Sequence, residues 1–433
     1  SYATFNLSDD QPVLMGKRIY WHPNTRKIRL KNDSEYIAEL RRLTEDAIKI
    51  RMDACDGPIG AEISGGLDST VIACMIKRLG REGRYFSWSR DPEEKPIVSP
   101  RDERILIQEV CERDQIVCQF RRFDNPEANL RFRDHVDRCS PSFVNCSTIS
   151  AACYWFEGQG VHMVMTGHGG DEGISRRLKS YELWHHKEYI PYIEALYDDT
   201  EGKGLRLLRT IKRFYVQTFK DSPRKIRADR SIDNIIELAK PEFLERMKKT
   251  VEIPEFTYFY DPKKYIEMGT IRHRMDNTSF QTPRFGIRYM YPYLDYRLLD
   301  YSLSIPRHLY HREEKNRWLY RETFKDILPQ SINRIYSKRS QSYVRDNTGI
   351  SETARMNQIE SMKDAISLLD RDYWSKYLDF DKLDHYELKK GCNQEEYDLY
   401  RLHVCRLLFF ILSRNLIINA SKPVKKLMEE EKS

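Results

Sequence analysis

Apolar and polar positions follow two alternating patterns through the first part of the chain. Short apolar runs that are typical of buried strands lie at 58–63, 85–89 and 161–166. Between them, apolar residues recur every three or four positions, which predicts helices over 35–52 and 103–112 and a third that carries Val71, Met75 and Leu79. Strands that alternate with helices at these distances predict an α/β fold with a doubly wound parallel sheet.

The pattern differs at the two ends of this region. Residues 1–34 are expected to form a short leader, with short strands at 18–21 and 27–30. From about residue 176 the chain is expected to be mainly helical, apart from a loop-like stretch near 281–295. A chain of 433 residues has room for one large α/β domain or for two or three smaller domains.

Composition indicates a folded protein, with 40% apolar and 32% charged residues. No apolar run approaches the roughly 20 residues that a membrane span needs, so no membrane association is expected. The nine cysteines include no CxxC pair, which favours free thiols in a reducing cytoplasm over a zinc or disulfide site. The net charge of +7 is too small for this length to indicate a nucleic-acid-binding protein by itself.

This charge is concentrated in one segment, residues 201–230. The segment holds ten basic and three acidic residues, so its excess of basic residues equals that of the whole chain. Leu205, Leu208, Ile211 and Tyr215 lie among them at helical spacing, which predicts a basic amphipathic helix. A helix with one solvated face is the commonest explanation, and an acidic peptide, an acidic protein or RNA are the partners that the charge would favour.

The first motif with recognisable chemistry follows the strand at 58–63 and reads Ser64-Gly65-Gly66-Leu67-Asp68-Ser69-Thr70. Two glycines allow backbone N–H groups to approach an anion closely, and the hydroxyls of Ser64 and Ser69 can donate to phosphate oxygens. Asp68 would repel a bare phosphate, so its presence favours a bound Mg²⁺. Neither a Walker A loop nor a GxGxxG loop is present. An ordinary strand-to-helix turn is the alternative.

A second glycine-rich motif, Thr166-Gly167-His168-Gly169-Gly170-Asp171-Glu172, follows the strand at 161–166. The first motif resembles the pyrophosphate loop of the N-type ATP pyrophosphatases, and the second resembles the Gly-x-Gly-x-Asp signature of their asparagine synthetase branch. The resemblance implies an adenine-nucleotide α-hydrolase-like fold for residues 35–433. It also implies that ATP is bound by Ser64, Gly65, Gly66, Asp68, Ser69, Thr70, Gly167 and Gly169, and Mg²⁺ by Asp68 and Asp171.

Two downstream segments extend this resemblance. The run from Arg317 to Glu322 resembles Lys-x-x-Leu-Arg-Glu, with Arg317 in place of the Lys. The segment from Leu328 to Lys338 resembles the one that ends in the family's catalytic lysine, with spacing about one residue longer. Arg317, Lys338 and His168 are therefore the catalytic candidates, with Lys338 stabilising the oxyanion and the phosphates. A solvated basic surface is the alternative for Lys338.

His168 occupies a position that varies within the family. Asparagine synthetases have Glu there, β-lactam synthetase has Tyr, and lasso-peptide macrolactam synthetases have His. An imidazole has an unperturbed pKa of about 6.5 and suits the deprotonation of an attacking amine. A turn residue that hydrogen-bonds the backbone is the alternative for His168.

The resemblance implies an AMP-forming carbon–nitrogen ligase that uses ATP and Mg²⁺ to activate a substrate carboxylate. The sequence has no glutaminase domain and no N-terminal Cys, so an amine on a substrate is favoured over ammonia from glutamine. The first hypothesis is a ligase of peptide or natural-product biosynthesis that is similar to a lasso-peptide cyclase. The alternatives are an asparagine synthetase that lacks its glutaminase domain, and a tRNA-binding nucleotidyl enzyme or nucleotide-binding module that uses 201–230.

Overall fold

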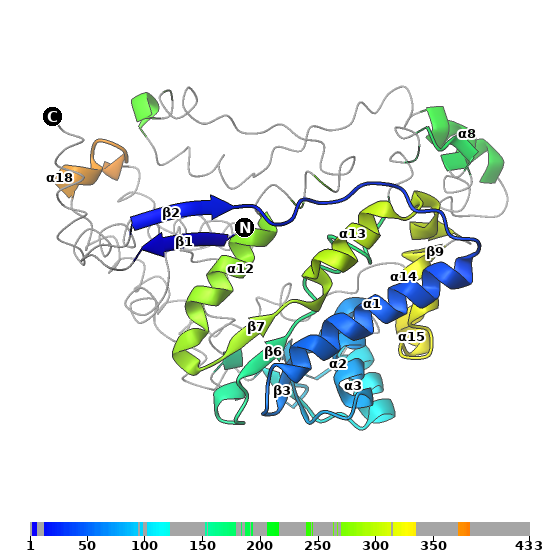
Figure 1. The fold of residues 1–433 in the computed structure, drawn as a ribbon, viewed down its shortest axis with the longest axis horizontal. Coiled ribbons are helices and arrows are strands. Elements are labelled where there is room, and N and C mark those ends of the chain that lie inside the picture. Colours follow the sequence, from blue (N-terminus) through cyan, green and yellow to red (C-terminus); the bar gives the residue numbers. More distant parts are fainter. Residues whose placement is uncertain are drawn as a thin grey trace.

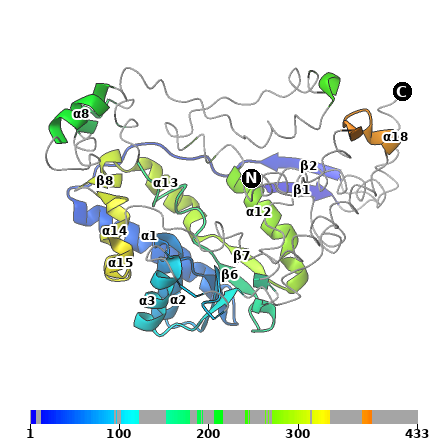
Figure 2. The same cartoon turned by 180° about the vertical axis from the view of Figure 1, so that it is seen from behind.

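The structure is a computed structural model, and most of the residues it describes surround one parallel sheet (Figures 1 and 2). The described residues are 2–6, 13–93, 96–97, 102–121, 152–153, 155–178, 183, 187–190, 192–193, 206–215, 240–243, 245, 263, 266, 270–312, 315–334 and 371–381. Among the predicted site residues, Lys338 lies outside this described part of the chain.

Five strands form the central sheet in the order β5-β4-β3-β6-β7, and every neighbouring pair is parallel. Their bounds are β3 Ile59–Glu62, β4 Gly83–Arg90, β5 Cys118–Arg121, β6 Met163–Met165 and β7 Arg288–Met290. Two antiparallel ribbons accompany the sheet, formed by β1 Tyr2–Asn6 with β2 Val13–Arg18 and by β8 His311–Arg312 with β9 Lys315–Asn316. The predicted α/β class with a doubly wound parallel sheet is confirmed.

The helices of the first half follow the predicted spans closely. They are α1 Asp33–Asp53, α2 Leu67–Arg78 and α3 Glu103–Asp114. The later helices are α8 Arg206–Tyr215, α12 Thr270–Gln281, α13 Tyr296–Ser304, α14 Trp318–Thr323, α15 Gln330–Asn333 and α18 Arg371–Trp374, with 3-10 turns η2 Pro283–Phe285, η3 Pro292–Leu294 and η4 Arg307–Tyr310. None of the helices in the described part of the chain combines the length and the apolar character needed to cross a bilayer.

The core lies on both faces of the sheet. On one face, fully buried residues of α1 and α2, such as Leu40 and Ile72, pack with Ala61 of β3. On the other face, Phe86 of β4 and Val164 of β6 belong to a separate cluster. Central strands that are buried on both faces appear in the sequence as continuous apolar runs, which explains why β3, β4 and β6 were predicted.

Three expectations from the sequence are corrected. The loop-like stretch near 281–295 contains edge strand β7 between two 3-10 turns. The short strands expected at 18–21 and 27–30 do not form, because β2 ends at Arg18 and residues 19–30 are not in a strand. This segment instead attaches to α13, where the backbone N–H of Ile28 donates to the carbonyl of Ser304 at 3.0 Å.

The basic segment at 201–230 is described only over α8, which stands apart from the five-stranded sheet in both views (Figures 1 and 2). Leu208, Ile211 and Tyr215 of the predicted apolar stripe are exposed, and so is Lys212 beside them.

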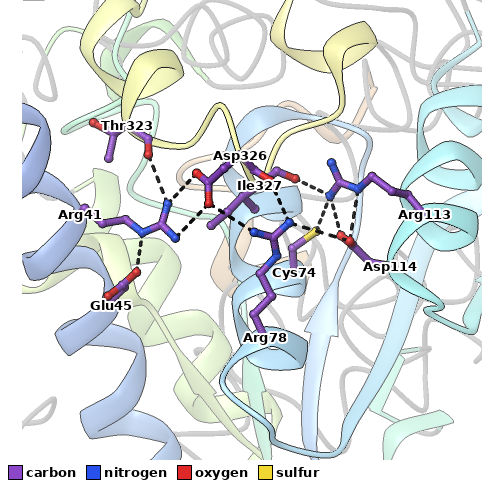
Figure 3. A network of polar contacts seen from close by, with 9 residues as sticks. All are labelled: Arg41, Glu45, Cys74, Arg78, Arg113, Asp114, Thr323, Asp326 and Ile327. Carbon is purple, nitrogen blue, oxygen red and sulfur yellow. Dashed lines mark hydrogen bonds and ion pairs between the residues drawn. The ribbon is translucent and has the colours of Figure 1, made fainter.

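A polar network fastens the segment after α14 to three helices (Figure 3). The carboxylate of Asp326 accepts hydrogen bonds from Arg41 of α1 at 2.9 Å and from Arg78 of α2 at 3.3 Å. Arg113 of α3 donates to the carbonyl oxygen of Ile327. The network therefore attaches the segment after α14 to α1, α2 and α3.

Candidate active site

The loop between β3 and α2 leaves backbone N–H groups available at a helix N-terminus. Gly66 is the N-cap of α2, and no side chain caps the helix. The loop is held by its own hydroxyls, since the N–H of Ser64 donates to Oγ of Ser69 at 3.1 Å and the two hydroxyl oxygens are 2.9 Å apart. Uncapped N–H groups and the positive end of the helix dipole suit an anion such as a phosphate.

The turn after β6 packs directly on this loop, as expected for parallel strands whose carboxyl ends share one edge of a sheet. A Cβ on Gly167 would lie 2.6 Å from the backbone nitrogen of Ser69, and a Cβ on Gly170 would lie 2.4 Å from Oδ1 of Asp68. Only glycine permits these approaches. The structure therefore brings the two glycine-rich motifs into direct contact.

The 3-10 turn η3 contacts both glycine-rich segments, at Asp68 and at Gly169. The hydroxyl of Tyr293 donates to the backbone carbonyl of Asp68 at 3.3 Å. Leu294 lies so close to Gly169 that a Cβ there would be 2.4 Å from its side chain. Tyr293 is fully buried and also hydrogen-bonds to the hydroxyl of Tyr320 in α14. The sequence reasoning did not single out Tyr293 as a site residue.

Arg317 joins the two predicted acidic residues. Its guanidinium contacts the carboxylate of Asp171 and lies 3.6 Å from Oδ2 of Asp68. Arg317 is 8% exposed and has a left-handed backbone with φ of 64°, a conformation that most residues avoid. Asp171 is half-exposed, whereas Asp68 is largely buried. The guanidinium thus offsets the repulsion between two neighbouring carboxylates.

Within the described residues, several buried polar atoms around this contact have no hydrogen-bond partner of normal geometry. They are Asp68 Oδ1, Thr70 Oγ1, Ser175 Oγ and Arg317 Nε, and the Ser175 hydroxyl lies close enough to Asp68 to lower its pKa. Buried polar groups are nearly always paired, and each unpaired group carries a desolvation cost of about 1–3 kcal/mol. A concentration of unpaired groups beside a helix N-terminus is typical of a site arranged for a polar ligand. Ser175, which was not among the site residues predicted from the sequence, lies three positions after the end of the second motif.

The same surroundings shift the titration of Asp68. Burial raises the pKa of Asp68 to about 7, the nearby carboxylate of Asp171 adds to the rise, and Arg317 opposes it. Burial and Asp171 also raise the pKa of Glu172. A strongly perturbed carboxyl beside a charged partner is a frequent property of functional sites.

The residues present fit a magnesium ion that is shared with a ligand. The described residues contain no group of three His, Cys, Asp or Glu side chains that would hold a metal without help. Magnesium commonly binds through one or two carboxylates together with substrate phosphates. Asp68 and Asp171 provide this number, and Oδ1 of Asp68 accepts no hydrogen bond of normal geometry from the described residues.

His168 lies in the turn between the two motif glycines and is half-buried. The turn is closed by Glu172, whose carboxylate accepts a hydrogen bond from the N–H of Gly169 at 3.1 Å. Of the three predicted catalytic residues, Arg317 lies within the contacts described above and His168 lies in the turn that carries Asp171.

A protein-family model described as asparagine synthase matches residues 39–387, which is most of the chain. The match covers both glycine-rich turns, all five strands of the parallel sheet and Arg317. No curated protein matches the chain.

Proposed function

The chain belongs to the asparagine synthase family, a family of AMP-forming carbon–nitrogen ligases that use ATP, and from this premise we propose that it joins a peptide or natural-product carboxylate to an amine. The observation that carries the proposal is the meeting of Asp68, Asp171 and Arg317 beside the uncapped N-terminus of α2. This arrangement suits a polyphosphate and the charge that develops when pyrophosphate leaves.

In the first step of the proposed reaction, a carboxylate oxygen of the substrate attacks the α-phosphorus of ATP, and the bond to the pyrophosphate oxygen breaks. The loop of Ser64, Gly65, Gly66, Ser69 and Thr70 would hold the leaving pyrophosphate, and Gly167 and Gly169 would shape the opposite wall. Asp68 and Asp171 would hold Mg²⁺, whose charge neutralises phosphate oxygens.

In the second step, the amine attacks the acyl-adenylate, AMP leaves, and the amine nitrogen gives up a proton. We propose that the imidazole of His168 accepts this proton, because His168 lies in the same turn as Asp171. Lys338, assigned by sequence resemblance alone, would stabilise the carbonyl oxyanion. We further propose a cytoplasmic protein in which residues 35–433 form one synthetase domain behind a leader at 1–34.

The test is release of pyrophosphate from ATP and Mg²⁺ with a panel of carboxylates and amines. The panel comprises free aspartate with ammonia, β-amino acids, and peptides that bear Asp or Glu. We expect release with peptide or β-amino-acid carboxylates and a matching amide product by mass spectrometry. Release with aspartate and ammonia alone would instead identify an asparagine synthetase. No release with any carboxylate would exclude the ligase.

A second candidate function concerns α8, on which three apolar side chains and Lys212 are exposed. This surface supports docking of an acidic peptide, an acidic protein or RNA at 201–230. A tRNA-binding enzyme would bind RNA with an affinity that falls steeply with salt and would show no carboxylate-dependent release of pyrophosphate. Filter binding at two salt concentrations distinguishes this alternative.

A further inference from the structure

Two adjacent arginines, Arg176 and Arg177, follow the second motif, and their side chains lie in different surroundings. The guanidinium of Arg176 stacks over the ring of Tyr310, 4.5 Å from its centroid. Arg177 is exposed, and the charged groups that act on it are Arg317 and Asp171. Among the described residues, no ion pair involves Arg177. Within the part of the chain that the structure describes, the guanidinium of Arg177 therefore lies near Asp171 without forming an ion pair.

The backbone holds Arg177 and Arg317 on neighbouring segments. The N–H of Leu178 donates to Oδ1 of Asn316 at 3.1 Å, and Nδ2 of Asn316 donates to the carbonyl of Leu178 at 2.9 Å. This two-bond clamp joins the residues that follow Arg177 and precede Arg317. The N–H of Arg317 in turn donates to the carbonyl of Tyr310, whose ring supports Arg176. These contacts therefore hold the backbone segments that carry Arg177 and Arg317 next to each other.

The charge balance of the site indicates why a second arginine beside Arg317 would favour a bound polyphosphate. Asp68 and Asp171 contribute two carboxylates, against which Arg317 alone makes ion pairs among the described residues. A bound polyphosphate brings several further negative charges, which the partial positive charge of a helix N-terminus offsets only in part. An additional guanidinium is well suited to this task, because its planar N–H donors bind phosphate oxygens in pairs.

We propose that Arg177 and Arg317 form a two-arginine site for the polyphosphate of the nucleotide, in which Arg177 binds phosphate oxygens near Asp171. The inference rests on the proposed function and deepens it. The partial desolvation of its guanidinium and the neighbouring Arg317 lower the pKa of Arg177, as expected for a guanidinium close to another cation. A phosphate oxyanion between the two arginines would relieve their mutual repulsion.

The test is calorimetric titration of the full chain with magnesium pyrophosphate, without acyl substrate. We expect Arg177→Gln to bind about tenfold to a hundredfold more weakly than the wild type, and Arg177→Lys to be intermediate, because one charge-assisted pair of hydrogen bonds is lost or reduced. The matched control is Arg42→Gln, which removes the same charge from α1, where Arg42 pairs with Glu39 on the surface. Wild-type affinity of Arg177→Gln, or equal weakening of Arg42→Gln, would overturn the proposal.

Steady-state kinetics separate the two anions that Arg177 could bind. The proposal requires Arg177→Gln to raise the KM for ATP. A rise confined to the KM for the carboxylate substrate would place Arg177 on the acyl side and overturn it. Failure of the wild type to bind magnesium pyrophosphate would also overturn it. Binding by the wild type without carboxylate-dependent release would instead exclude the proposed ligase function and leave the two-arginine site standing.

Discussion

The carboxylates at the two ends of helix α2 differ in their hydrogen bonding and in the direction of their pKa shifts. At the N-terminal end, Asp68 has a buried oxygen without a hydrogen-bond partner, and burial raises its pKa to about 7. At the C-terminal end, Arg78 donates to both the carboxylate and the backbone carbonyl of Asp326. Burial would raise the pKa of Asp326, but the hydrogen bond and charge of Arg41 outweigh it, so this pKa lies below its usual value.

The difference separates a group held for a ligand from a group that holds the fold together. An unsatisfied, desolvated carboxylate destabilises the protein and is retained where a ligand or ion restores its interactions. A carboxylate shared by two arginines is already satisfied, and its contribution is a modest stabilisation. The same helix therefore carries the proposed chemistry at one end and a structural attachment at the other.

The largest effect is expected from Asp68→Asn. Loss of this carboxylate removes one of two proposed magnesium ligands next to the phosphates, so carboxylate-dependent release of pyrophosphate should fall by about 10³-fold or more. The measurement is initial rate at saturating ATP, with Asp326→Asn as the control because it changes the same residue type at the other end of α2. Near-normal turnover of Asp68→Asn would exclude Asp68 from the proposed role.

The sequence predicted the centre of this fold better than its edges. Strands β3, β4 and β6 lie between other strands and are buried, so their apolar runs were recognisable. Edge strands β5 and β7 are as long as β3 and β6, respectively, but their residues, Cys118–Arg121 and Arg288–Met290, are largely polar or aromatic. Such strands exist because a neighbour offers backbone partners, and a single-sequence pattern does not contain that information.

The residues of the candidate site also divide into those that a local pattern predicted and those that depend on distant packing. Both glycine-rich turns were recognised from the sequence, and they follow parallel strands, which explains the close approach of Gly167 to Ser69. Ser175 and Arg177 were missed because their surroundings depend on packing between distant segments. The clamp between Leu178 and Asn316, for example, joins residues 138 positions apart. The local spacing of residues in a sequence does not predict such a contact.

A second prediction uses pH to test the N-terminal end of α2 in magnesium-free buffer. The folded pKa of Asp68, about 7, is above its ordinary value of 3.8, so folding favours the protonated form. The wild type should therefore lose stability from this residue as pH rises from about 4 to about 7. The amide that replaces the carboxyl in Asp68→Asn does not titrate, so the advantage of this variant should grow by about 1–3 kcal/mol across the same window and then level off. Urea unfolding at several pH values measures it; parallel curves would contradict the raised pKa.

The smallest effect is expected at the C-terminal end, from Asp326→Ala. Its side chain is 54% exposed, so solvent screens its pairs with Arg41 and Arg78, and the loss of unfolding free energy at pH 7 should be only about 1 kcal/mol. Because the folded pKa of Asp326 is lowered, this contribution should be present above its unfolded pKa and vanish as pH falls below about 4, opposite in sign to Asp68. The control Glu39→Gln breaks one exposed pair and should cost about 0.3 kcal/mol.

Turnover of Asp326→Ala should stay at the wild-type level, since the attachment lies at the opposite end of α2 from the glycine-rich loops. If Asp326→Ala lost turnover without losing stability, the C-terminal end of α2 would not be only a structural attachment.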